Sequence, residues 1–399
     1  MQNVVVTGLG AVSPIGTGID AFWEALCAGR SGLGPITHFD ASSFRSKLAG
    51  EVRGFDPSRL GDGAERISRC HQYALAAVIE AVRAAALPPE LLPQTGICGG
   101  TNFGSLEWGH RHLVAVSKGE PADPLWWEQF RFASGVELIA ARLGLGGLRA
   151  LVSLSCASGV AAAGVAVDAI RWGRTKAMVA VGYDELSLFC YSGLSALRAI
   201  SQDTIRPFDK NRSGTIFAEG AGALLLEAES SARARGATIY ARVLGHSMNN
   251  DAFHMTAPDK SGKGIIAVMQ AALEDAGIEP TRIDHINAHG TGTQMNDKIE
   301  TASIKAVFGA HACKMPIVSM KSMMGHTMGA AGSLESIGSI LTICNGVIPP
   351  TINLETPDPE CDLDYVPGQA RRQQVDTVLC NSYGFGGTNA AMVFARAET

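Results

Sequence analysis

The stretch Leu148-Arg-Ala-Leu-Val-Ser-Leu-Ser-Cys-Ala-Ser-Gly-Val-Ala-Ala-Ala163 changes character at Cys156. The residues before it are mostly apolar, and the residues after it are small and helix-forming. This pattern predicts a strand, a tight turn and a helix, with Cys156 at the helix N-terminus. The partial positive charge there favours a thiolate over a thiol. A Cys among small residues is nevertheless more often a core residue than a nucleophile.

Strands and helices alternate along the rest of the chain. Buried strands are predicted by short β-branched runs at Val4–Val6, Ala177–Val181 and Ile283–Asn287. Helices are predicted by Ala-rich segments over residues 72–86, 158–172 and 264–276. This alternation predicts an α/β fold with mainly parallel sheets covered on both faces. Residues 101–135 are expected to form a loop with short helices.

The composition favours a compact enzyme. Of the 399 residues, 46% are apolar and 18% are charged, which allows a large buried core. The net charge of −5 gives no electrostatic reason to expect nucleic acid as a partner. The nine cysteines are scattered without CxxC pairs, which favours a reduced, cytoplasmic protein. We expect no signal peptide before the first strand and no contact with a membrane, because no apolar run is long enough to cross one.

Three further motifs carry reactive or flexible residues. They are His289-Gly-Thr-Gly-Thr293, Lys321-Ser-Met-Met-Gly-His326 and Gly384-Phe-Gly-Gly387. Each motif is common by itself, and a lone His is usually structural. Together with Cys156, however, they supply a thiol, two imidazoles and an ammonium group. Such a set can move an acyl group and stabilise a carbanion.

Two other patterns are weak. His285 and His289 are four residues apart, but their surroundings indicate a strand, and no HExxH motif is present, so we expect no metal. The segment Gly8-Leu-Gly-Ala-Val-Ser13 lacks the third Gly of a dinucleotide fingerprint and is followed by Pro14, so we expect no bound NAD.

With these motifs in place, the chain resembles the β-ketoacyl-acyl carrier protein synthases, the elongating ketosynthases of the thiolase superfamily. The resemblance runs nearly end to end and is densest in Arg206-Pro-Phe-Asp-Lys210, Asn287-Ala-His-Gly-Thr-Gly-Thr293 and Pro349-Pro-Thr-Ile-Asn353. It implies a thiolase-like fold, a five-layered α-β-α-β-α sandwich made of two similar halves. We place the boundary at residue 250, so that residues 1–250 carry the nucleophile and residues 251–399 carry the two His and the Lys.

The resemblance also implies roles for individual residues. Cys156 would hold the acyl group, and His289 and His326, both expected at Gly turns after strands, would stabilise an enolate. Lys321 would tune His326 and the thiol, with Glu335 as its partner. The remaining roles are support of the His289 loop by Asp297, gating by Phe385, and an oxyanion hole formed by the N–H groups of Cys156 and Phe385.

Some positions depart from the family. Ser155 stands where relatives usually have Ala, which should alter local packing. Trp108 is expected in the wall of the acyl pocket, where it would shorten or reshape the pocket. Asp62 and Glu65 interrupt the basic segment around Arg66 and Arg69 that would receive an acidic carrier protein. Further docking candidates are Arg206 and Lys210. These departures favour a specialised polyketide, polyene or unusual fatty-acid pathway over housekeeping synthesis.

The predicted function is a decarboxylative Claisen condensation that extends an acyl chain by two carbons. The expected partners are an acyl carrier protein and a second subunit, either another copy or a chain-length factor, and no organic cofactor is expected. The main alternatives are a silent chain-length factor and a ketosynthase active only as a heterodimer. The two-His pattern argues against a thiolase or an initiating synthase, and a cysteine hydrolase would leave Lys321 and His326 idle.

Overall fold

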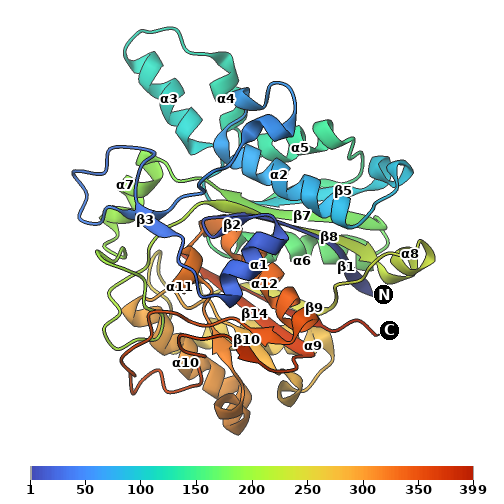
Figure 1. Ribbon diagram of the computed structural model, residues 1–399, viewed down its shortest axis with the longest axis vertical. Coiled ribbons are helices and arrows are strands. Elements are labelled where there is room, and N and C mark those ends of the chain that lie inside the picture. Colours follow the sequence, from blue (N-terminus) through green and yellow to red (C-terminus); the bar gives the residue numbers. More distant parts are fainter. Residues whose placement is uncertain (1, 399) are drawn as a thin grey trace.

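The computed structural model describes residues 2–398, which fold around one 11-stranded sheet (Figure 1). The strands follow the order β11-β10-β14-β15-β9-β1-β8-β7-β5-β6, with β2 paired to β1. Their bounds are β1 (Val4–Ser13), β2 (Gly16–Thr17), β5 (Gly96–Gly100), β6 (Arg149–Val152), β7 (Ala177–Asp184), β8 (Gly220–Ala228), β9 (Ala241–Asn250), β10 (His285–Asn287), β11 (Ile317–Val318), β14 (Thr377–Gly384) and β15 (Thr388–Ala395). Two small sheets pair β3 (Leu33–Pro35) with β4 (Leu48–Gly50), and β12 (Val347–Ile348) with β13 (Arg371–Arg372).

Twelve α-helices connect and cover the strands of the described residues. They are α1 (Ile19–Cys27), α2 (Arg69–Ala84), α3 (Leu106–Ser117), α4 (Pro124–Phe130), α5 (Ser134–Leu143), α6 (Ser158–Arg171), α7 (Leu188–Ala196), α8 (Glu229–Ala234), α9 (Lys263–Ala276), α10 (Gln294–Phe308), α11 (Lys321–Met324) and α12 (Ala331–Asn345). The helices predicted from the sequence correspond to α2, α6 and α9 and begin and end within three residues of their predicted bounds. The expected short helices of residues 101–135 are α3 and α4, of which α3 spans 12 residues.

The prediction of mainly parallel sheets is wrong. The strands at the centre of the sheet, from β7 through β8, β1, β9 and β15 to β14, pair antiparallel. Parallel pairing is confined to the two ends, where β5 joins β6 and β7, and β10 joins β11 and β14. Both faces of β1, β7 and β8 are buried, so these strands show apolar runs whatever their direction, and the sequence pattern could not distinguish the two arrangements.

The expected five layers are present. Helices α6 and α12 lie between the two halves of the sheet and share the largest apolar cluster with both. Helices α2 and α5 cover the outer face of the β7–β8 side, and α9 and α10 cover the outer face of the β10–β14 side (Figure 1). The sheet runs without interruption from one half to the other through the β1–β9 pair. The boundary at residue 250 therefore stays a prediction.

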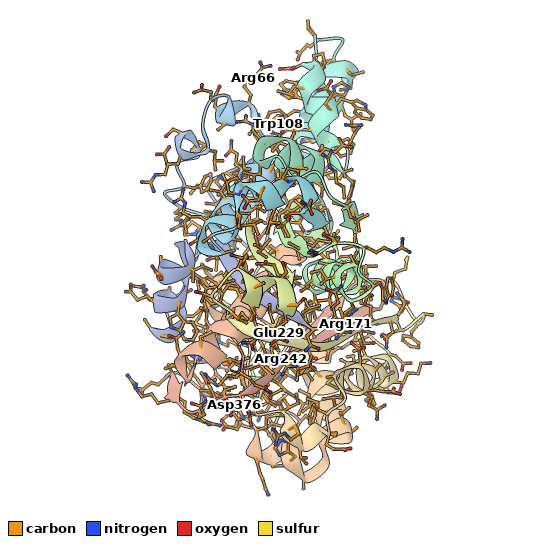
Figure 2. All side chains as sticks on the ribbon, turned by 90° about the vertical axis from the view of Figure 1, so that its right-hand side faces the viewer. Arg66, Trp108, Arg171, Glu229, Arg242 and Asp376 are labelled. Atoms are coloured by element: carbon orange, nitrogen blue, oxygen red, sulfur yellow. The ribbon has the colours of Figure 1, made fainter. Side chains whose placement is uncertain are left out.

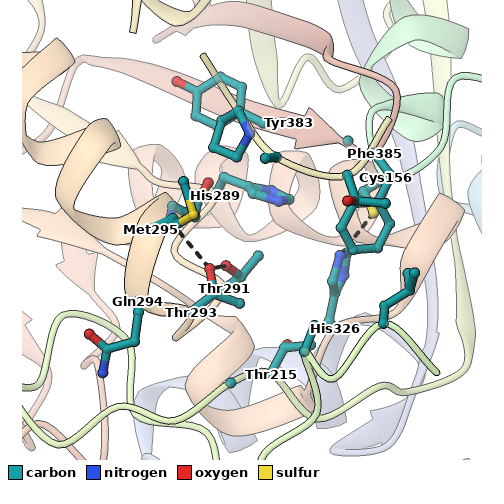
Figure 3. A pocket seen from close by; sticks show the side chains of 18 of the residues that line it. Cys156, Thr215, His289, Thr291, Thr293, Gln294, Met295, His326, Tyr383 and Phe385 are labelled. Carbon is teal, nitrogen blue, oxygen red and sulfur yellow. Dashed lines mark hydrogen bonds between the residues drawn. The ribbon is translucent and has the colours of Figure 1, made fainter. Parts of the chain in front are cut away.

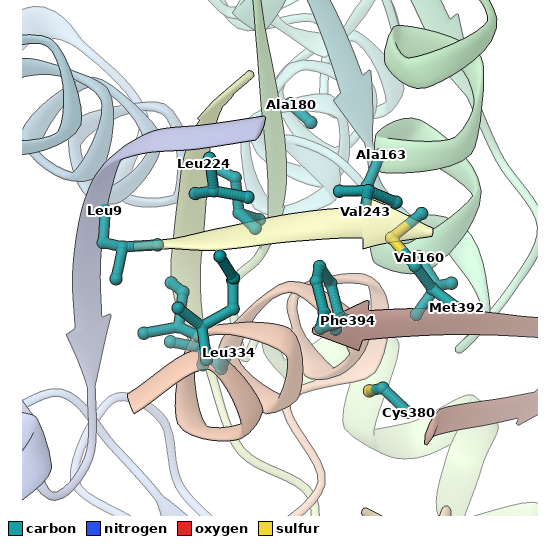
Figure 4. Packing of buried hydrophobic residues seen from close by; sticks show 14 of the residues in the cluster. Leu9, Val160, Ala163, Ala180, Leu224, Val243, Leu334, Cys380, Met392 and Phe394 are labelled. Atoms are coloured by element: carbon teal, nitrogen blue, oxygen red, sulfur yellow. The ribbon is translucent and has the colours of Figure 1, made fainter. Parts of the chain in front are cut away.

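Alternating side chains on each strand connect these layers. In β8, Leu224 and Leu226 point to the central layer, whereas Leu225 points to α2. In β15, Met392 and Phe394 point to the central layer and Val393 to α9 (Figure 4). This alternation follows from the two-residue period of a strand. Within the central layer, the first turns of α6 and α12 lie against each other, since a Cβ on Gly159 would lie 2.6 Å from the Ser333 nitrogen.

Candidate active site

Cys156 lies in a tight turn between β6 and α6, as predicted. Ser155 has a φ of 53°, in the left-handed region that non-glycine residues rarely adopt. The Ser158 hydroxyl stabilises the turn by donating to the Ser155 carbonyl at 2.6 Å and accepting the N–H of Leu154 at 2.9 Å. The turn aims Cys156 into a cavity while only 4% of its surface is exposed.

The resting Cys156 is a thiol. Burial raises its pKa to about 11, while the Lys321 charge, the Ser155 hydroxyl and the Phe385 N–H act in the opposite direction. The predicted preference for thiolate at the helix N-terminus is therefore outweighed by desolvation. Ser155 affects more than the packing that the sequence suggested, because its hydroxyl lowers the pKa of Cys156.

His326 is held against the nucleophile. Its Nε2 lies 3.0 Å from Cys156 Sγ, and its backbone is fixed by hydrogen bonds to Ile216 and Ala218. It follows α11 and not a strand, which corrects the prediction, because Lys321–Met324 form a short helix. The N–H of Met328 donates to His326 Nδ1 at 3.3 Å. Since burial lowers the pKa of His326 well below its usual value, the ring is neutral and carries its proton on Nε2.

His289 follows β10, as predicted, and has the same protonation pattern for a different reason. The Lys321 ammonium donates to His289 Nδ1 at 3.3 Å. Burial and the Lys321 charge lower the pKa of His289 well below its usual value. The neutral ring therefore carries its proton on Nε2. The two imidazole rings meet edge to face with their centroids 5.5 Å apart.

Lys321 and Glu335 form a completely buried ion pair. Burial raises the pKa of Glu335 to about 7, against the lowering effect of Lys321. A buried charge without a partner is costly, so each group stabilises the other. The sequence suggested this pair, and the structure places it directly behind His289.

Two carboxylates at the start of α10 hold the His289 loop. Asp297 accepts the N–H groups of Gly292 and Phe208, which agrees with its expected support of the loop. Glu300, which the sequence analysis missed, accepts the N–H groups of His289 and Gly290 at 2.8 Å each. The detectable signal was the i, i+3 spacing, which places both carboxylates on one helix face.

Asp184, at the end of β7, was also missed. Its buried carboxylate accepts the N–H groups of Asn102, Phe103 and Gly329 and the hydroxyl of Thr101. It therefore connects the turn after β5 to the segment that follows His326. No local pattern reveals this, because the partners lie about 80 and 145 residues away along the chain.

A cavity of about 380 Å³ leads to Cys156, His289 and His326. Figure 3 shows the two histidines and Cys156 around it, with Phe385 beside the thiol. Polar groups on its wall come from Thr215, Thr291, Thr293, Gln294 and Asn296. The loop of Phe385 is joined to the loop after β9, because the N–H of Gly386 donates to the Met255 carbonyl at 2.7 Å.

The other predicted residues lie outside this cavity or are engaged elsewhere. Trp108 is on α3 and does not line the cavity, and Figure 2 shows it with Arg66 near the α3–α4 end. The Arg69 side chain donates hydrogen bonds inside the fold, to the buried Glu219 carboxylate at 3.2 Å and to the Leu186 carbonyl.

The two remaining docking candidates differ from each other. Arg206 pairs with Asp203 at 2.7 Å, whereas the side chain of Lys210 is exposed. Arg206 also lies next to the cavity wall, because its backbone borders Gly292.

Within residues 2–398, no helix is long and apolar enough to cross a membrane. Over the same residues, no three His, Cys, Asp or Glu side chains are arranged to hold a metal ion. All nine cysteines are free.

Family models match most of the chain. Residues 1–232 match the beta-ketoacyl synthase N-terminal domain, and residues 240–355 match its C-terminal domain. The 3-oxoacyl-[acyl-carrier-protein] synthase 2 of Coxiella burnetii is 40% identical over 410 residues, covering 99% of both chains. The tetracenomycin polyketide synthase ketoacyl synthase alpha subunit of Streptomyces glaucescens is 39% identical, covering 100% of this chain and 98% of the relative.

Solved structures agree. The ishigamide ketosynthase/chain length factor superposes with a TM-score of 0.95 at 39% identity, covering both chains completely. A ketosynthase of a type II polyketide system, solved with its acyl-carrier protein and bound to a hexaketide, gives a TM-score of 0.91 at 33% identity, again with complete coverage.

Proposed function

The chain belongs to the beta-ketoacyl synthase family of carbon–carbon bond-forming acyltransferases, and we propose that it extends carrier-bound acyl chains by two carbons. The observation that carries this proposal is the arrangement of a thiol and two neutral Nε2–H donors around one cavity. A hydrolase would use His326 to accept the thiol proton, but here Nε2 already holds a proton.

The first step transfers an acyl group to Cys156. The sulfur attacks the thioester carbonyl of the acyl group on a phosphopantetheine arm, and the carbon–sulfur bond to the arm breaks. The thiol proton passes to the departing arm sulfur, so that the carrier leaves as a free thiol. The His326 Nε2–H and the Phe385 N–H stabilise the charge that develops on Sγ during this transfer.

The second step removes CO2 from a malonyl thioester. The bond between the carboxylate and the central carbon breaks, and its electron pair moves to the thioester oxygen as an enolate. Nε2–H groups of His289 and His326 donate to that oxygen, and such donors are worth about 3 kcal/mol each. Neutral imidazoles suit this role because they donate without first needing a proton.

The third step forms the carbon–carbon bond. The enolate carbon attacks the acyl carbonyl on Cys156, and the N–H groups of Cys156 and Phe385 stabilise the oxyanion. The carbon–sulfur bond to Cys156 then breaks and releases a β-ketoacyl carrier, and the Cys156 thiolate takes up a proton from water to restore the resting thiol. These steps need no bound organic cofactor, because the carrier supplies both substrates.

We propose that a carrier protein and a second subunit complete the enzyme. Solved relatives include a complex with an acyl-carrier protein and a ketosynthase/chain length factor. An apolar surface on α3 and α7 supports a subunit contact, since Leu113 and Phe189 are each 57% exposed. The second subunit is another copy or a chain-length factor.

The free cysteines support a reducing, cytoplasmic location.

We propose that the chain acts in a specialised pathway and not in housekeeping fatty-acid synthesis. Fatty-acid and polyketide relatives are almost equally similar, at 40% and 39% identity. The ishigamide enzyme, at a TM-score of 0.95, supports the specialised alternative. A silent chain-length factor is disfavoured because Cys156 and His326 are in contact at 3.0 Å.

The test is intact-protein mass spectrometry after mixing the chain with carrier proteins loaded with acyl groups from acetyl to long polyunsaturated chains. We expect a thioester adduct that disappears in Cys156→Ala, and the preferred acyl group identifies the pathway. If the wild-type chain forms no adduct even when co-expressed with candidate second subunits, the proposal is wrong.

A further inference from the structure

Large apolar side chains face solvent at the opening of the cavity. Leu197, Phe253, Met255 and Met295 expose 43%, 56%, 79% and 40% of their surfaces. Leu197 and Met295 line the cavity, and Met255 is bonded through its carbonyl to the Phe385 loop. These side chains, here called the mouth rim, come from the end of α7, the loop after β9 and the first turn of α10. The fold therefore gathers them from segments far apart in the sequence.

Charge at the same opening is limited. Of the residues that line the cavity, Arg198 is the one Lys or Arg. Asp251 also lines it, but its carboxylate accepts a hydrogen bond from Asn389 at 2.7 Å and is only 8% exposed. The nearby Arg206 is neutralised by Asp203. Arg198 is exposed, and so is Lys260 in the loop after β9, so a few cations remain near this opening. Because exposed charges are screened beyond about 10 Å at 0.1 M salt, they act on an acidic partner only at short range.

We propose that the mouth rim is the principal contact surface for the carrier protein, which is bound here by apolar contact more than by charge. This inference rests on the proposed function, since a carrier-bound acyl group must pass this opening to reach Cys156. Methionine and aromatic side chains are enriched at protein interfaces, and methionine adapts to more than one partner shape. Clustered exposed apolar groups mark interaction sites. The fitting carrier presents apolar side chains around the attachment point of its arm.

The experiment compares two acyl donors. Octanoyl-loaded carrier and octanoyl-pantetheine, which lacks the protein, each acylate Cys156, and kcat/KM is measured by mass spectrometry at about 50 mM and about 500 mM NaCl. The variants are Met255→Ser, Phe253→Ser and the double variant Phe253→Ser/Met255→Ser, whose side chains are exposed and do not line the cavity. The matched control is Trp172→Ser, which removes a 66% exposed apolar side chain at the opposite end of α6.

We expect the double variant to lose about tenfold or more in kcat/KM for the carrier and less than about twofold for octanoyl-pantetheine. Trp172→Ser should match the wild type, and salt should change the carrier reaction less than about threefold. The inference is wrong if the rim variants leave the carrier reaction unchanged, slow both donors equally, or dissociate an oligomer in sedimentation. A fall of more than tenfold in the kcat/KM of the wild-type chain for the carrier at about 500 mM NaCl would also overturn it. Failure of the proposed function is distinct, since neither donor would then acylate the wild-type chain.

Discussion

At the scale of single residues, both catalytic imidazoles carry their proton on Nε2, but different donors bind their Nδ1 atoms. His326 Nδ1 receives a main-chain N–H, and His289 Nδ1 receives the Lys321 ammonium. Removing Lys321 should therefore take a hydrogen bond from His289 but not from His326, while Cys156 and His326 lose only the effect of a nearby charge. We predict that Lys321→Met lowers malonyl decarboxylation by about 10²–10³-fold, because the Nε2–H donor is no longer fixed. Acyl transfer to Cys156, which depends on His326, should fall much less; CO2 release and acyl adducts measure the two steps separately.

The same substitution leaves the Glu335 carboxylate buried without a partner, which should cost about 3–5 kcal/mol of unfolding free energy. The double variant Lys321→Met/Glu335→Leu removes that penalty and provides the control. It should regain stability in urea unfolding yet remain slow in decarboxylation. Recovery of decarboxylation in the double variant would show that Lys321 contributes only stability.

His71, a buried residue remote from the chemistry, should make the fold acid-sensitive. Burial lowers its pKa from 6.5 to about 4. Between those values the unfolded chain binds a proton that the folded chain cannot, so stability is complete above pH 6.5 and falls as the pH drops towards 4. The loss amounts to about 1.4 kcal/mol per pH unit. His71→Phe should flatten the decline of Tm below pH 6.5, whereas replacement of the exposed His254 should not.

At the scale of elements, the contact between β5 and α6 sets the position of the nucleophile. A Cβ on Gly100 would lie 2.3 Å from the Ser158 carbonyl in the first turn of α6. We predict that Gly100→Ala displaces this turn and lowers acylation of Cys156 by about 10²-fold. Gly193→Ala is the control, because it lies in α7 with no atom within 4 Å of the new methyl group. That variant should keep full activity and gain about 0.5–1 kcal/mol.

At the scale of the whole molecule, the central layer makes the two halves interdependent. Helices α6 and α12 pack in one apolar cluster that includes strands from both sides. Residues 1–234 alone would expose the α6 face that α12 covers. We predict that this fragment is insoluble or binds a hydrophobic dye, and that co-expression with residues 235–399 restores a folded complex. A soluble, cooperatively unfolding fragment on its own would contradict this view.

The sequence predicted the local elements and the reactive residues, because strand, turn and helix around Cys156 depend on neighbours in the chain. It did not predict the antiparallel pairing of β7, β8 and β1, because strands buried on both faces look alike in either direction. It missed Asp184 and Glu300, whose roles exist only where distant backbone N–H groups converge. The raised pKa of Cys156 was also hidden, since burial is a property of the assembled layers.

The Met328 amide that fixes the tautomer of His326 also affects how easily mutation can remove that hydrogen bond. A main-chain N–H survives every amino-acid replacement at its position except proline, so drift in the gene rarely removes it. The corresponding hydrogen bond to His289 Nδ1 comes from the Lys321 side chain, which is paired with Glu335. A change in the codon of either residue can therefore remove it. Of the two Nδ1 hydrogen bonds, the one to His289 is therefore the more easily removed by substitution.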